Sequence, residues 1–331
     1  MTLLTTRDHL EAVIGTPPTM VMAKTIDHLD PGALSWLAAS VIMVASVAHD
    51  DDVDVVIGGD APGWATGDQA TLILPAASLD EAGCLVPGTG FGSIFLVPGL
   101  NEIMRVNGRV ASNDQSEIRV RIDECYIHCG KALIRSDFWS PMSAKPDEVS
   151  LDALVGACRF LALATCDSHA NADLSPKGDP AGLMVRLDDG AIRFADRPGN
   201  RRIDSFRNMI EQPRVAAALI VPGLHQLIIV RGRAGITDDL SEREAFTVGD
   251  KVPQLVTVVD DARIELRDSP ALRRAAAWPA PPPPEGLKAG KIAAGHLKLS
   301  KAVGAKLAGY VMSVPGLVER ELAKDYKTNL Y

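Results

Sequence analysis

An internal repeat sets the strongest limit on what this chain can fold into. Residues 41–63 align with residues 160–182 at a constant shift of 119 positions, which puts a Gly-Asp pair at the same place in both copies. Two further matches follow in the same order, at the Val-Pro-Gly turns 97–99 and 221–223 and at Trp139 and Trp278. Self-similarity over such a distance is typical of duplicated structural units. We therefore expect two copies of one fold in tandem.

Each copy has the texture of short β-strands. Apolar runs such as residues 41–47, 53–57 and 93–97 are separated by turns rich in Gly, Pro and Asp, a pattern typical of a barrel or a sandwich. Residues 130–139 then read as one helix. We predict a mainly β fold with peripheral helices, divided into a helical lead-in (1–35), a first, degenerate repeat (36–140), a second repeat (151–278), and a Pro-rich linker with a helical tail (279–331) that includes Leu317 and Leu322.

Composition narrows the class of protein. The 331 residues are 47% hydrophobic, which is enough to bury two cores. A net charge of -8 gives no reason to expect nucleic acid as a partner, and no apolar run has the length of a membrane span. Five cysteines and a start unlike a signal peptide favour reduced thiols in the cytoplasm. Cys125, His128 and Cys129 have no second Cys/His pair at zinc-like spacing, so we expect no metal.

The second repeat contains a basic turn that suits an anion. Its sequence Arg-Pro-Gly-Asn-Arg-Arg brings Arg197, Arg201 and Arg202 together after an expected strand. Asn200 can cap a helix that begins at Arg201, so guanidinium groups and free helix N–H groups would converge on one phosphate. An ordinary exposed basic turn is the alternative.

The two copies have lost opposite features. At the place of the basic turn, the first copy has residues 76–84, which are uncharged or acidic. At the end of the second copy, Pro270 replaces Lys131, and the aromatic residue that matches Phe138 is missing. If the copies pack about a pseudo-twofold axis, one composite site keeps both its turn and its helix while the other loses both. The sequence thus predicts one ligand per chain.

A family resemblance rests on the second repeat. Residues 160–179 end in Ser-Pro-Lys-Gly-Asp and are followed by Asp-Arg-Pro-Gly-Asn-Arg-Arg at 196–202, Gln-Pro-Arg-Val at 212–215 and Val-Arg-Gly-Arg-Ala at 230–234. This stretch resembles the pyridoxamine 5'-phosphate oxidase-like flavoproteins, which have a split β-barrel. Residues 128–139 also look like the ending of a probable FMN-dependent branch of that family.

The resemblance implies two tandem split β-barrels that form a pseudo-dimer within the chain, with one FMN between them. Arg201 and Arg202 would hold the phosphate, beside Arg197 and Asn200. The strand that faces the flavin ring would contribute Ser175, Pro176, Lys177, Gly178 and Asp179, and the facing repeat would contribute Lys131, Arg135 and Trp139.

The implied function is an FMN-dependent oxidoreductase acting on a small-molecule substrate or electron donor. No residue stands out as a general acid or base, and the substrate-binding signature at the C-terminus of the characterised oxidases is missing. Pyridoxamine phosphate is therefore not the expected substrate. Three alternatives stay open: a non-catalytic flavin-binding or sensing protein, a haem-binding protein and a deazaflavin-binding protein of the same fold. Whether two chains associate further is also open.

Overall fold

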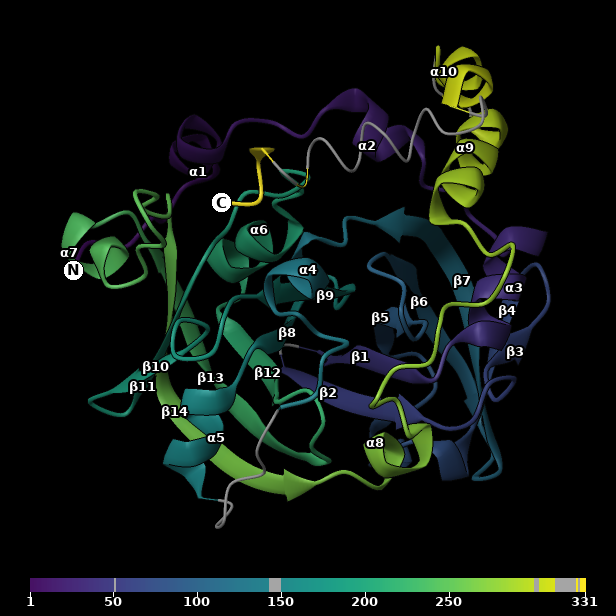
Figure 1. Ribbon diagram of the computed structural model, residues 1–331, viewed down its shortest axis with the longest axis horizontal. Helices are drawn as coiled ribbons and strands as arrows, with labels where there is room; N and C mark the ends of the chain where they lie inside the picture. Colours follow the sequence, from purple (N-terminus) through teal and green to yellow (C-terminus); the bar gives the residue numbers. More distant parts are fainter. Residues whose placement is uncertain (51, 143–149, 301–303, 313–325, 327) are drawn as a thin grey trace.

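Two seven-stranded antiparallel sheets form the body of the protein (Figure 1). The computed structural model describes residues 1–331 except 51, 143–149, 301–303, 313–325 and 327. The first sheet contains β1 (Ile42–His49), β2 (Asp52–Gly59), β3 (Thr66–Gly67), β4 (Thr71–Pro75), β5 (Gly90–Leu96), β6 (Ile103–Asn113) and β7 (Glu117–His128). The second contains β8 (Phe160–Cys166), β9 (Ala172–Gly178), β10 (Arg186–Asp188), β11 (Ala191–Ala195), β12 (Arg214–Ile220), β13 (Gln226–Thr237) and β14 (Val256–Asp268).

The strand orders of the two sheets correspond strand for strand. The first sheet has the order β2-β1-β5-β6-β7-β4-β3, and the second, read from its far edge, has β9-β8-β12-β13-β14-β11-β10. If the strands of each sheet are numbered from one in chain order, the two strand orders become identical, as expected for a duplicated unit. The predicted fold class, mainly β with peripheral helices and a helical C-terminal region, is confirmed.

The sheets pack against each other through a shared apolar cluster. This cluster includes Val44 and Ile94 of the first sheet and Phe160 and Leu174 of the second. Between the two sheets the buried Ser46 hydroxyl donates to the carbonyl of Thr165 at 3.4 Å, and Thr165 is the residue that the 119-position shift places on Ser46. Two equivalent residues in contact mark the position of a pseudo-twofold axis.

Glycine allows the close approach of the two repeats at two related places. A Cβ on Gly178 would lie 1.9 Å from the carbonyl oxygen of Ala132, and a Cβ on Gly59 would lie 2.6 Å from that of Ala271. Each pair joins the end of a strand in one repeat to a short helix of the other. The repeated Gly-Asp pair therefore has a packing reason, since any larger residue would push the two repeats apart.

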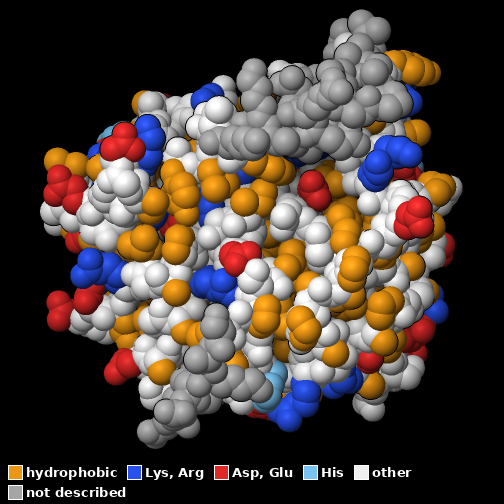
Figure 2. All heavy atoms as spheres, viewed as in Figure 1, with side chains coloured by type: hydrophobic (Ala, Val, Ile, Leu, Met, Phe, Trp, Pro, Cys, Tyr) orange, Lys and Arg blue, Asp and Glu red, His pale blue; other side chains and the backbone are white. Residues whose placement is uncertain are grey.

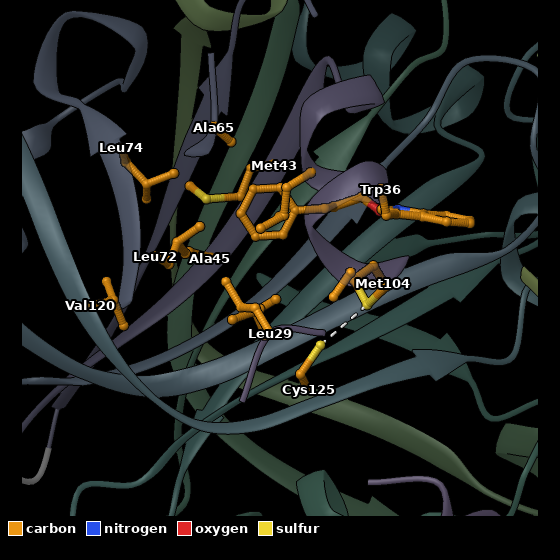
Figure 3. Close-up of a cluster of buried hydrophobic side chains, with 14 of the residues drawn as sticks. Leu29, Trp36, Met43, Ala45, Ala65, Leu72, Leu74, Met104, Val120 and Cys125 are labelled. Atoms are coloured by element: carbon orange, nitrogen blue, oxygen red, sulfur yellow. Dashed lines mark hydrogen bonds between the residues drawn. The ribbon is translucent and has the colours of Figure 1, made fainter. Parts of the chain in front are cut away.

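Each sheet also covers its own core. In the first repeat, Leu29, Trp36, Met43 and Leu72 converge beneath the sheet, and the thiol of Cys125 points to Met104 at 3.5 Å (Figure 3). Burial in this core raises the pKa of Cys125. Among the described residues, no group of three or more His, Cys, Asp or Glu side chains is placed to hold a metal ion.

Ten α-helices among the described residues surround the sheets: α1 (Arg7–Ile14), α2 (Thr19–Ala23), α3 (Pro31–Ala39), α4 (Lys131–Arg135), α5 (Leu151–Ala157), α6 (Asp204–Glu211), α7 (Leu240–Glu244), α8 (Pro270–Ala275), α9 (Ala289–Leu299) and α10 (Ala305–Met312). Short 3-10 turns occur at η1 (Ala76–Ser78) and η2 (Ala82–Cys84). In the described parts of the chain, none of the helices has the length and hydrophobicity that crossing a membrane requires.

In the predicted tail the structure describes two helices, α9 and α10. Helix α9 packs on the first repeat, because Ala289, Ile292 and Ala293 join the core beneath that sheet. Leu317 and Leu322, which the sequence placed in a second tail helix, lie outside the described residues.

Candidate functional site

A cavity of about 530 Å³ lies where the two repeats and both terminal segments meet. Its wall combines β9, the turn after β11, the start of α4, Ile14 at the end of α1, and the residues Asn329 and Tyr331. Among the described residues, six basic side chains line it, against one acidic side chain, that of Asp196: Lys131, Arg135, Lys177, Arg197, Arg201 and Arg202. The positive charge is concentrated at the cavity, whereas the molecular face in Figure 2 carries a mixture of basic, acidic and hydrophobic side chains.

Strand β9 supplies one wall of the cavity. Ser175, Pro176, Lys177 and Gly178 all line it. A proline fits here because β9 is the edge strand of its sheet. The ammonium group of Lys177 lies 2.7 Å from a carboxylate oxygen of Asp196 and 4.8 Å from the centre of the Phe206 ring, which fixes a positive charge beside this strand.

Asp179 lies behind the wall and not on it. Its carboxylate is fully buried and accepts from Nε of Arg197 with both oxygens, at 3.0 and 2.8 Å. Burial raises the pKa of Asp179, and the Arg197 guanidinium beside it opposes that rise. A second nitrogen of Arg197 donates to the carbonyl of Phe246 at 2.8 Å. Asp179 therefore positions Arg197, and it does not reach the cavity.

The basic turn differs from the predicted helix start. Helix α6 begins at Asp204, because Arg201 has a left-handed backbone with φ of +56° that a helix cannot include. Asn200 instead accepts from the backbone N–H of Arg202 at 3.0 Å, which closes a tight turn. Its side-chain nitrogen is buried without a hydrogen-bond partner in the described part of the chain.

Arg201 and Arg202 have different surroundings. The side chain of Arg202 is 7% exposed, donates to Asp204 at 2.8 Å and covers the ring of Tyr126 at 4.4 Å. Arg201 is exposed and lines the cavity, and no hydrogen bond or ion pair joins its guanidinium to another described residue. Of the two arginines, Arg201 is the one whose donors are available to a ligand.

Helix α4 brings the first repeat to the cavity. Arg135 donates to the carbonyl of Gly178 at 2.9 Å, and its equivalent in the second repeat, Arg274, approaches the carbonyl of Gly59 at 3.3 Å. Because both half-sites have this contact, it belongs to the packing of the two repeats. Arg135 also donates to the carbonyl of Pro198 at 3.1 Å, and so links helix α4 to the basic turn.

Trp139 lies away from the cavity. The predicted helix over 130–139 is wrong in length, since α4 ends at Arg135 and Asp137 has a φ of +45° that turns the chain. The indole of Trp139 donates to the carbonyl of Leu100 at 2.6 Å and packs against Trp278, with 6.5 Å between ring centres. This tryptophan is part of the packing between the repeats.

The pseudo-equivalent half-site is acidic, as expected from residues 76–84. There Asp80 accepts from the hydroxyl of Ser269 and from the backbone N–H of Ala271 at 3.0 Å, so its carboxylate caps helix α8. Glu81 pairs with Arg267 at 2.9 Å. Carboxylates thus fill the positions where the other half-site presents the basic turn.

Several lining residues were not among the site residues predicted from the sequence, which had singled out His128 and Cys129 only as an incomplete set of metal ligands: Ile14, His128, Cys129, Phe206, Gln254, Asn329 and Tyr331. His128 has a buried Nδ1 without a hydrogen-bond partner among the described residues. Burial, together with the nearby cations Arg105 and Lys24, holds the pKa of His128 well below its usual value. Only the fold brings these residues together, because they come from five separate parts of the chain.

Comparison with known proteins supports the resemblance found in the sequence. Residues 149–278 match the sequence model of the pyridoxamine 5'-phosphate oxidase family. The second repeat is therefore similar in sequence to the pyridoxamine 5'-phosphate oxidase family, and the predicted resemblance is confirmed. No curated protein matches the chain.

Solved structures match over little more than a third of the chain. HupZ from Group A Streptococcus is 20% identical, with 37% of this chain and 96% of HupZ covered and a TM-score of 0.29. General Stress Protein 26 from Bacillus anthracis is 16% identical, with 36% and 95% covered and a TM-score of 0.26. A pyridoxamine 5'-phosphate oxidase-related, FMN binding protein from Nostoc punctiforme is 13% identical, with 38% and 87% covered and a TM-score of 0.25.

Proposed function

We propose that the cavity between the repeats binds one FMN per chain and that the protein is an FMN-dependent oxidoreductase. One observation carries the proposal: an acidic chain, with a net charge of -8, concentrates six basic side chains around a single cavity. Such a collection of charge favours a ligand with a phosphate group.

The residues present fit FMN. A volume of about 530 Å³ falls in the range of roughly 300–1,000 Å³ that is usual for sites of this kind. The exposed guanidinium of Arg201 and the unpartnered side-chain nitrogen of Asn200 supply donors for the phosphate. Strand β9, which lines the cavity with Pro176 and Gly178, would face the ring.

Bound FMN would supply the electron-transfer chemistry, while the chain supplies orientation and charge. Lys177 has a fixed place in this arrangement, because Asp196 and the Phe206 ring hold its ammonium group at the cavity wall. A positive charge at that place would stabilise negative charge on the reduced ring.

The visible spectrum of the purified protein tests the proposal. We expect a flavin spectrum, either as purified or after FMN is added to the apoprotein, and bleaching when NADH or NADPH is added without oxygen. A flavin spectrum that no donor bleaches would favour the non-catalytic flavin-binding protein. A haem Soret band without flavin would refute the proposal, and so would a deazaflavin that binds where FMN does not.

A further inference from the structure

The last residues of the chain form part of the cavity. Asn329 and Tyr331 line it together with Ile14 of α1 and Phe206 of α6. In Figure 1 the yellow C-terminal residues accordingly lie beside these two helices. With Asn329 and Tyr331 in its wall the cavity has a volume of about 530 Å³, so these residues bound it and leave it large enough for a cofactor.

Both repeats hold this C-terminal segment. From the first repeat, Lys131 donates to the carbonyl of Asn329 at 2.9 Å, and Arg135 donates to that of Leu330 at 2.8 Å. From the second repeat, the guanidinium of Arg197 lies 5.4 Å from the centre of the Tyr331 ring. Three basic residues assigned to the cofactor from the sequence thus position residues 329–331. Charge-assisted hydrogen bonds of this kind are among the stronger ones in proteins.

Tyr331 supplies the composite site with an aromatic side chain that is partly exposed. Trp139, expected there from the sequence, packs between the repeats instead. Phe206 lines the cavity but is only 4% exposed and has the ammonium group of Lys177 over its ring. Tyr331 is partly exposed at the cavity and is held on one side by Arg197.

We propose that Tyr331 packs against the flat ring of the bound flavin, and that Lys131 and Arg135 act by holding the segment that carries it. The proposal rests on the proposed function and names the residue that recognises the ring. An aromatic ring against a planar heterocycle contributes substantially to binding, and a partner fixed in advance loses little conformational freedom.

Riboflavin, which is FMN without its phosphate, separates the contact to the ring from the contact to the phosphate. We expect Tyr331→Ala to weaken the binding of FMN and of riboflavin by the same factor, on the order of tenfold. The bound flavin should also become more fluorescent, because a quenching ring is lost. Tyr331→Phe should keep both affinities within about twofold, since it keeps the ring. As a matched control, Arg201→Gly should weaken the binding of FMN and leave the affinity for riboflavin unchanged.

Each outcome has a separate meaning. Wild-type protein that binds neither flavin would refute the proposed function. Wild-type protein that binds FMN, together with a Tyr331→Ala variant of equal affinity and equal flavin fluorescence, would refute only the role of Tyr331. Tighter binding by Tyr331→Ala would also refute it, because the segment would then compete with the cofactor. If the alanine variant fails to fold, a Tyr331→Phe variant that loses affinity for both flavins would refute the role of the ring, because that variant keeps it.

Discussion

Replacing Arg201 by glycine separates cofactor binding from folding. The guanidinium of Arg201 has no hydrogen bond or ion pair with another described residue, so its removal breaks no such contact in the described part of the chain. Its backbone has a φ of +56°, a conformation that costs a non-glycine residue roughly 1 kcal/mol. Glycine removes that cost, but it also gives the unfolded chain more conformational entropy, which offsets the gain by about as much. We expect the free energy of unfolding of the apoprotein to change by less than about 1 kcal/mol.

The affinity for FMN should respond much more strongly. Hydrogen bonds from a charged donor to the phosphate are worth about 1.5–3 kcal/mol, which corresponds to a roughly 10- to 150-fold rise in Kd. Flavin fluorescence titration measures the Kd, and urea unfolding of the apoprotein measures stability.

Arg202→Ala provides the contrast. This side chain is 7% exposed, pairs with Asp204 at 2.8 Å and covers the Tyr126 ring. Its loss should lower the free energy of unfolding by about 2–4 kcal/mol. The reasoning is refuted if Arg201→Gly binds FMN as tightly as wild type, or if Arg202→Ala keeps full stability.

Three further predictions concern packing and protonation. Gly178→Ala should destabilise the protein by several kcal/mol, on the order of a severe core substitution, because its Cβ would lie 1.9 Å from the carbonyl oxygen of Ala132. Gly156→Ala, which has open space around it, should not destabilise the protein, and thermal unfolding of the two variants compares them. Asp179→Asn should cost about 3–5 kcal/mol by breaking a buried ion pair; equal urea midpoints would contradict this. His128 stays neutral in the fold, so stability should be full above a pH of about 6.5 and should fall below it. His128→Gln should flatten that fall, and an unchanged slope would contradict the assignment.

The matching strand orders of the two sheets agree with the repeat predicted from the sequence, whose Gly-Asp pairs have the same structural reason in both copies. Gly59 and Gly178 allow a helix of the opposite repeat to approach, so they sit at matching positions in both copies. The basic turn and β9 line the same cavity, and both could be located in the sequence because β9 is a strand of the second repeat and the turn directly follows its strand β11. Ten of the twelve predicted site residues line that cavity, while Asp179 and Trp139 do not.

The remaining features depend on long-range packing. The sequence around the basic turn does not indicate that Arg202 lies over the ring of Tyr126, a residue of the other repeat, or that Arg201 has a left-handed backbone. The end of α4 at Arg135 also depends on the turn at Asp137, which periodicity does not reveal. Tyr331 lies at the cavity in a segment held from almost 200 positions away, since Lys131 and Arg135 donate to the carbonyls of Asn329 and Leu330.

The number of FMN molecules bound per chain tests the central claim most directly. One half-site has the basic turn, while its pseudo-equivalent has Asp80 and Glu81 in contact with helix α8 and Arg267. Titration of apoprotein of known concentration with FMN, at concentrations far above the Kd, gives the stoichiometry. We predict one FMN per chain. Two tightly bound FMN per chain would contradict the single composite site.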